Sequence, residues 1–304
     1  MDRGYVKGHA GQIHYFTQGK GEAVLLLHQT ARTGGIYNRV ADVLSPHYRV
    51  VAMDFPGFGG SDPFPGSFEV SDLVQSVLDV MDGLGIEKVR VSGHHTGAVV
   101  SGELASSHPD RVVAWAPTGY PYRTAEEREQ SLKGVPSLKG VPSITPSMYL
   151  GGHRNPVSLQ MESDGTHLFR IWQQATSCLY HARGAPGPVV MFPPENLPKE
   201  DLLFVNDMII DYLRAFDYQL PTLLAVRRYD ANARLPLIKA PSLIIQSTGP
   251  FEPTFCQRSE MVQRLVPGSR VASIKNGDIH VIYTRGEELG KLLLDFFRNP
   301  RKSR

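Results

Sequence analysis

The sequence has little cysteine and no excess of charge of either sign. Among its 304 residues there are two cysteines, Cys178 and Cys256, too few for a disulfide framework and without metal-ligand spacing. Lys and Arg number 32 and Asp and Glu 30, so no charge surplus favours nucleic acid or an anionic membrane. We therefore expect a small-molecule substrate, no nucleic-acid or membrane partner, and no cofactor.

Long apolar runs are also absent. No run reaches the roughly 18 apolar residues that cross a bilayer, and the first residues lack the apolar core of a signal peptide. These absences predict a cytoplasmic protein. The length exceeds the usual size of one domain, so we expect a single core that carries an insertion, as a monomer or homodimer.

Short apolar runs alternate with helical patterns along much of the chain. The runs are of strand length and continuously apolar, as expected of strands covered by helices on both faces. They lie at residues 23–27, 50–53, 89–91, 112–115, 243–245 and 271–274. Apolar residues at helical spacing mark 70–84 and 289–297, and an alternating pattern around Gly11 predicts a β-hairpin. This alternation predicts a mostly parallel sheet with helices on both sides.

The pattern breaks between residues 118 and 235. This stretch is rich in proline, has a helical piece at 202–216 and shows no convincing strand. We expect 118–235 to be a mainly helical lid inserted into a core formed by 1–117 and 236–304. Inside it, the six residues Ser-Leu-Lys-Gly-Val-Pro occur twice in succession, which indicates a local duplication in a tolerant loop.

The most informative segment is Gly93-His94-His95-Thr96-Gly97. A predicted strand enters it, a predicted helix leaves it, and the glycines lie two residues on either side of His95. This is the arrangement of a nucleophile elbow, where small residues let the strand and helix approach closely. An elbow would direct the His95 side chain into a pocket, while His94 would turn away from it, which favours a core role for His94.

With three other segments, the elbow resembles the α/β-hydrolase family. His28-Gln29-Thr30 follows a predicted strand as the family's oxyanion loop does, although Gln29 replaces the usual glycine. Residues 54–62 resemble the family's Asp-x-Pro-Gly-x-Gly-x-Ser turn, and 276–280 match its catalytic-histidine loop. The resemblance implies an α/β-hydrolase fold with an oxyanion hole made by the backbone amides of Thr30 and Thr96. His95 stands where the family presents its nucleophilic serine.

The same resemblance assigns further roles. His280 occupies the general-base position, and the acid usually follows the strand predicted at 243–245. Pro250 falls at the common aspartate position, which leaves Glu252 as the nearest carboxylate, with an exposed loop glutamate as the alternative.

Other residues are expected near the pocket. They are His28, Gln29 and Trp172, although His28 has a structural alternative and lid packing alone would also account for Trp172. A zinc site among the histidines is not expected, because adjacent side chains point apart and no ligand-spacing motif is present.

Two classes of function fit these residues. The first is an enzyme that acts on an ester, thioester, lactone or β-dicarbonyl, in which His280 activates water or abstracts a proton. His95 is then either a nucleophile that forms an acyl-imidazole or a second acid/base, so lyase or cyclase chemistry stands beside hydrolysis. The second is a binding protein that kept the fold and lost the reaction. A pure binder has no chemical need for His280, and this favours the enzyme.

Overall fold

A computed structural model describes residues 1–133, 163–169, 171–172, 176, 198–215, 217–249, 257–277 and 279–300. Glu252, Asp278, Pro250 and both cysteines lie outside these ranges, as does most of the duplicated hexapeptide.

An eight-stranded sheet forms the centre of the molecule, in the order β1-β2-β4-β3-β5-β6-β7-β8. The first two strands form the predicted antiparallel hairpin and β2 pairs antiparallel with β4, while every later pairing is parallel. The strands are β1 (Asp2–Gly8), β2 (Gly11–Gln18), β3 (Ala23–Leu27), β4 (Arg49–Met53), β5 (Val89–His94), β6 (Val112–Thr118), β7 (Leu243–Ser247) and β8 (Arg270–Ile274). The predicted parallel strands are confirmed.

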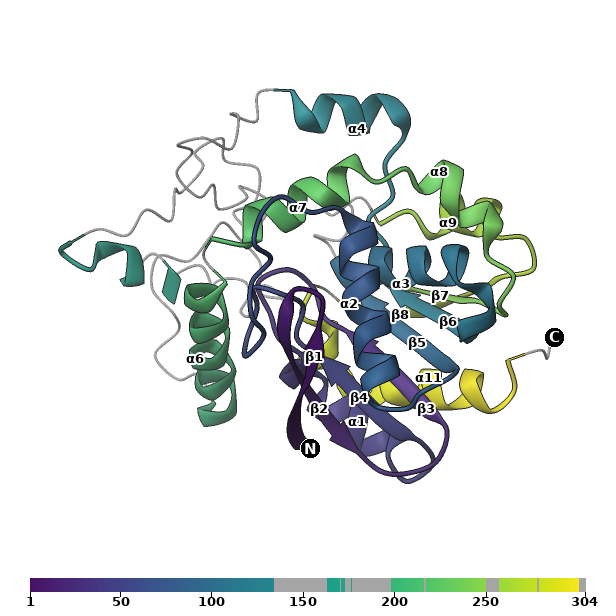
Figure 1. The fold of residues 1–304 in the computed structure, drawn as a ribbon, viewed down its shortest axis with the longest axis horizontal. Helices are drawn as coiled ribbons and strands as arrows, with labels where there is room; N and C mark the ends of the chain where they lie inside the picture. Colours follow the sequence, from purple (N-terminus) through teal and green to yellow (C-terminus); the bar gives the residue numbers. More distant parts are fainter. Residues whose placement is uncertain are drawn as a thin grey trace.

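Helices cover both faces of this sheet (Figure 1). Side chains of β3 alternate between the faces: Leu25 and Leu27 pack with α2 (Val70–Gly83) and α3 (Thr96–Ser107). Val24 and Leu26 pack on the other side with α1 (Asn38–Leu44) and α11 (Gly286–Arg298). The remaining core elements are η1 (Gly34–Tyr37), η2 (Pro109–Arg111), η4 (Leu235–Leu237), α9 (Ser259–Leu265) and α10 (Val281–Thr284). The chain has the α/β-hydrolase fold.

The described part of the predicted insertion is helical. Its helices are α4 (Ala125–Leu132), α6 (Lys199–Arg214), α7 (Gln219–Arg228) and α8 (Ala231–Arg234). Among the described residues between Thr118 and Leu243 there is no strand. Helix α4 packs along α7 at the top of Figure 1, and α6 carries Phe204, Val205 and Met208, which pack against Ala31 beside the sheet. The insertion limits 118 and 235 remain a prediction.

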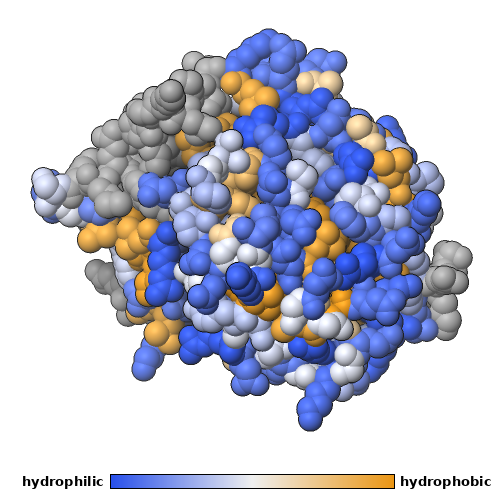
Figure 2. Space-filling view, in the orientation of Figure 1, coloured by the Kyte–Doolittle hydropathy of each residue, from blue (hydrophilic) through white to orange (hydrophobic). Residues whose placement is uncertain are grey.

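The surface is mainly hydrophilic, with apolar atoms in small groups (Figure 2). Several exposed apolar side chains come from the insertion: Leu168, Phe169, Leu203 and Ile210. Within the described ranges, no helix is long and apolar enough to span a bilayer.

Candidate functional site

The turn between β5 and α3 holds His95 in a backbone conformation that L-residues rarely adopt. Its φ is 47° and its ψ is −107°. A Cβ on Gly93 would lie 2.1 Å from the carbonyl oxygen of Gly97, and a Cβ on Gly97 would lie 2.0 Å from that of Leu27. Both glycines are therefore required for the close approach of strand and helix. The backbone conformation of His95 costs on the order of 1–3 kcal/mol, which the surrounding packing offsets.

His95 lines a small cavity of about 30 Å³ at the edge where the parallel strands end. Gln29, Thr30, Thr96 and Ile279 line the same cavity, so it includes the predicted oxyanion residues. His95 is buried, with 8% of its surface exposed. Burial, and next the neighbouring charges of His94, Arg123 and His280, hold the pKa of His95 well below its usual value. The His95 imidazole is therefore neutral near pH 7.

Thr30 and Thr96 meet across this cavity. Their Oγ1 atoms lie 2.6 Å apart in a buried hydrogen bond. Thr96 is also the first residue of α3, where backbone amides have no acceptor within the helix. The two positions expected to form the oxyanion hole are thus brought together from separate loops.

His94 lies in the core, as expected from its place in the elbow. Its Nδ1 is 3.1 Å from the carbonyl oxygen of Thr118, and its Nε2 is 3.0 Å from that of Ile279. Burial lowers the pKa of His94 to about 4, although both carbonyls act in the opposite direction. Gln29 donates from Nε2 to the same Ile279 oxygen at 3.2 Å. Gln29, which replaces the glycine typical of the family, therefore helps to hold the loop that carries His280.

His280 directly precedes α10 and is 4% exposed. The Phe204 ring of α6 packs edge-on against it, with 5.5 Å between the ring centroids. Burial lowers the pKa of His280 to about 3, and the nearby charges of Arg32 and His94 act in the same direction. His280 is therefore neutral near pH 7 in these surroundings.

A buried ion pair lies beside His280 and links the loop after β3 to α6. The Nε atom of Arg32 donates to Asp211 Oδ2 of α6 at 3.0 Å, and the Arg32 guanidinium lies 4.7 Å from the centre of the Phe204 ring. Burial raises the pKa of Asp211 to about 6, against the influence of Arg32. Neither residue belongs to a recognisable motif, and the sequence analysis missed both.

Two residues expected in the pocket lie elsewhere. His28 is fully buried: its Nδ1 is 2.7 Å from the carbonyl oxygen of Gln29, and its Nε2 accepts the Phe55 amide at 2.9 Å. Both ring nitrogens serve the backbone, so the structural alternative for His28 is the one seen. Trp172 packs against the apolar cluster around Phe204 and is not among the described residues that line the cavity.

Three further residues approach His95. Arg123 and Arg227 line its cavity, and Gln257 Nε2 lies 3.5 Å from His95 Nε2. No sequence motif marked them. The predicted acid, Glu252, lies outside the described residues. Within those residues no group of three or more His, Cys, Asp or Glu is placed to hold a metal ion.

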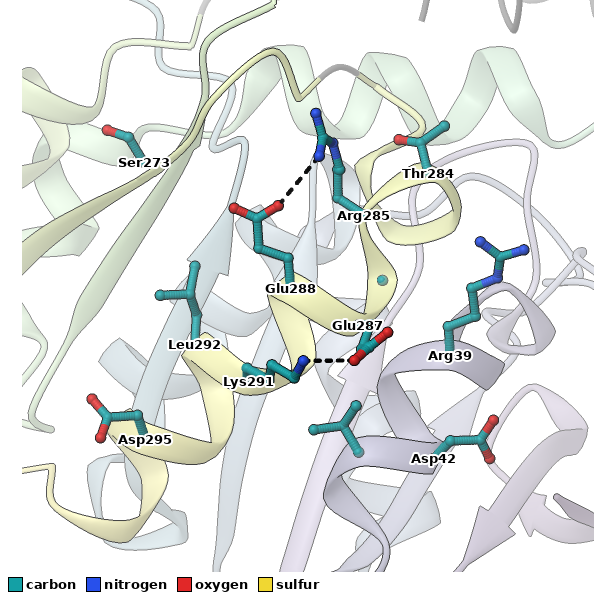
Figure 3. Close-up of a pocket in the computed structure, with 12 residues that line it drawn as sticks. Arg39, Asp42, Ser273, Thr284, Arg285, Glu287, Glu288, Lys291, Leu292 and Asp295 are labelled. Atoms are coloured by element: carbon teal, nitrogen blue, oxygen red, sulfur yellow. Dashed lines mark hydrogen bonds and ion pairs between the residues drawn. The ribbon is translucent and has the colours of Figure 1, made fainter. Parts of the chain in front are cut away.

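A larger groove of about 950 Å³ lies between α1 and α11 and, among the described residues, shares none of its lining with the His95 cavity. Figure 3 shows that acidic and basic side chains along it pair with each other: Lys291 with Glu287 at 2.6 Å, and Arg285 with Glu288 at 3.8 Å. Its charges are largely balanced, and neither His95 nor His280 lines it. The candidate site is therefore the His95 cavity.

Comparison with known proteins agrees with this fold. Residues 22–140 match the family described as "alpha/beta hydrolase fold". The chain is 29% identical over 117 residues to an (E)-2-((N-methylformamido)methylene)succinate hydrolase of Acinetobacter baylyi, a match that covers 38% of this chain and 44% of the relative. The chain spans less than half the length of the curated relatives it matches.

Solved structures resemble the whole chain at low sequence identity. Epoxide hydrolase A of Mycobacterium thermoresistibile has a TM-score of 0.74 at 21% identity, and the match covers 98% of each chain. The enol-lactonase of Burkholderia xenovorans has a TM-score of 0.70 at 17% identity and covers 97% of this chain and 100% of its own. These relatives are named for different reactions, so the similarity extends to the fold and not to one chemistry.

Proposed function

Starting from an α/β-hydrolase fold whose elbow presents a histidine, we propose that this protein is a hydrolase-like enzyme acting on a carbonyl-containing small molecule. The substrate classes that fit are an ester, a thioester, a lactone or a β-dicarbonyl. The observation that carries the proposal is His95, which keeps a φ of 47° while lining the cavity with Thr30 and Thr96. A chain without use for this position could relax the turn and avoid the cost of its conformation.

In this proposal the amides of Thr30 and Thr96 stabilise negative charge on the substrate oxygen. His280 takes a proton from water or substrate, and His95 serves as a second acid/base. A nucleophilic role for His95 through an acyl-imidazole is the other route. We favour the acid/base role because imidazole lacks the hydroxyl that the family's usual route transfers, and lyase or cyclase chemistry then stands beside hydrolysis.

The low pKa of His280 makes a negative partner necessary. An imidazole with a pKa of about 3 is a weak base near neutral pH. A carboxylate next to it would raise that pKa, and we propose Glu252 for this role because it follows β7 in the chain. Glu252→Gln should then lower kcat and move the acidic limb of the pH profile to lower pH.

The test is a panel of nitrophenyl esters with wild-type protein, His280→Ala and His95→Ala. Exposed imidazoles also hydrolyse activated esters. The matched control is therefore His47→Ala, which removes an exposed histidine. The proposal expects the two site variants to lose turnover and the control to keep the wild-type rate. Equal rates in all four proteins would contradict it and would favour a binding protein that retains the fold.

A further inference from the structure

The cavity beside His95 combines positive charge with an apolar wall. Arg123 and Arg227 both line it, and the described residues that line it include no Asp or Glu. Leu223, Val226 and Pro121 supply apolar surface. The substrate's chemistry should reflect both features.

The helix α7 accounts for much of this composition. Leu223, Val226 and Arg227 lie three and four positions apart, so they share one face of the helix. That face is turned toward the elbow, because these residues line the same cavity as His95 and Thr96. The neighbouring Arg228 points elsewhere: it is exposed and its Nη2 lies 2.8 Å from Glu69 Oε1.

Arg123 differs from the arginines around it. Arg128 pairs with Asp230 at 2.7 Å, and Arg258 pairs with Glu127 at 2.7 Å. Within the described part of the chain Arg123 forms no ion pair of its own; the pKa of Glu127 is lowered first by Arg258, which binds it, and less by the charge of Arg123. A half-buried guanidinium in a cavity is an available partner for a ligand carboxylate.

The charges around the two catalytic candidates have the same sign. After burial, which has the largest effect, Arg123 lowers the pKa of His95 and Arg32 lowers that of His280. Asp211 offsets Arg32 from the side of α6 at 3.0 Å, whereas the described lining of the His95 cavity offers no such acid. A bound carboxylate would place a negative charge beside Arg123.

We propose that the His95 cavity selects substrates that carry a carboxylate, with Arg123 as its principal partner and Arg227 as the second. This deepens the proposed function and rests on it: the carbonyl group that reacts and the carboxylate that is recognised belong to one small molecule. The apolar wall from α7 and Pro121 contacts the short carbon chain between them.

The probes are butyrate and its neutral isostere butyramide, with dissociation constants measured by NMR titration. We expect wild-type protein to bind butyrate about tenfold more tightly than butyramide, which is the effect of one good charge-assisted contact. Arg123→Gln should remove this preference, and Arg227→Gln should reduce it. The control Arg228→Gln, next to Arg227 but paired outside the cavity, should retain it. Circular dichroism confirms that each variant is folded.

Equal binding of butyrate and butyramide, or a preference that persists in Arg123→Gln, would overturn the inference. The ester panel separates this from the fate of the proposed function. Turnover of esters without a preference for butyrate would refute the carboxylate site and leave the proposed enzyme activity standing. A butyrate preference that depends on Arg123, without turnover of any ester, would support the carboxylate site and refute the proposed enzyme activity.

Discussion

The Nε2 atom of His94 lies 3.0 Å from the carbonyl oxygen of Ile279, the residue directly before His280. The other nitrogen of the same ring is 3.1 Å from the carbonyl oxygen of Thr118, at the end of β6. One buried side chain thereby connects the elbow, the neighbouring strand and the loop of the predicted base. We expect His94 to position His280 through the backbone.

His94→Ala should lower the free energy of unfolding by about 1–3 kcal/mol, because it removes a buried imidazole that contacts two carbonyl oxygens. Gln29→Ala should cost less, since the Ile279 oxygen then keeps its contact with His94. Urea unfolding measures both. If positioning matters for catalysis, His94→Ala also reduces kcat on the best ester more than it changes KM. Equal losses of stability in the two variants would rule out His94 as the main connection.

A second prediction concerns the strain at His95. Glycine adopts positive φ without steric cost, so His95→Gly should be more stable than His95→Ala by about 1 kcal/mol. The control is the same pair of substitutions at Ser101 inside α3, where alanine should be the more stable by about 1 kcal/mol. Thermal and urea unfolding compare the four variants. The same preference at both positions would mean that the elbow of the folded protein is unstrained.

Much of the core could be predicted because strand and helix patterns there are set by burial. Residues 23–27 read as a strand covered on both faces, and β3 packs Leu25 into one core cluster and Leu26 into the other. The spacing of Gly93 and Gly97 was also informative, since both are needed for contacts that no side chain permits. Such features leave a local signature in the sequence.

The surroundings of the site left no such signature. Arg123 precedes α4 and Arg227 lies on α7, and only the folding of the predicted insertion over the sheet brings both to the His95 cavity. The role of Gln29 depends on the position of Ile279, 250 residues away. His28 was placed near the pocket because it follows a strand, but its two backbone hydrogen bonds turn it into the core.

The buried histidines predict how stability depends on pH. Burial lowers the pKa of His28 and His94 to about 4 and that of His280 to about 3, from 6.5. Between about pH 6.5 and 4 the unfolded chain binds protons that the folded protein does not, so stability falls as pH falls. Each such histidine adds about 1.4 kcal/mol per pH unit in that window. Asp211 has a pKa raised to about 6, so the folded protein binds a proton there below pH 6 and gains stability as pH falls. This single group is outweighed by the three histidines.

His28→Gln tests this directly. A glutamine amide has both a donor and an acceptor to replace the two bonds that His28 makes with the backbone. The slope of unfolding free energy against pH between 6.5 and 4 should then decrease by about 1.4 kcal/mol per unit. The exposed His47→Gln is the control for the loss of a histidine at the surface. An unchanged slope in His28→Gln would show that His28 is not neutral in the folded protein.

The last prediction separates the chemistry of His95 from that of the usual serine. His95→Ala should abolish turnover of the best ester and leave the fold intact, because alanine fits the same turn without offering a proton acceptor. His95→Ser places a hydroxyl where the family presents its nucleophile, within the cavity that Thr30 and Thr96 line. Nitrophenolate is a good leaving group, so acylation should outrun deacylation, in which His280 must activate water. We therefore expect a burst of roughly one nitrophenol per enzyme molecule followed by slow turnover. The burst should disappear in the double variant His95→Ser/His280→Ala. A burst that survives without His280 would show that His280 is not the base, and full activity in His95→Ala would remove His95 from the reaction altogether.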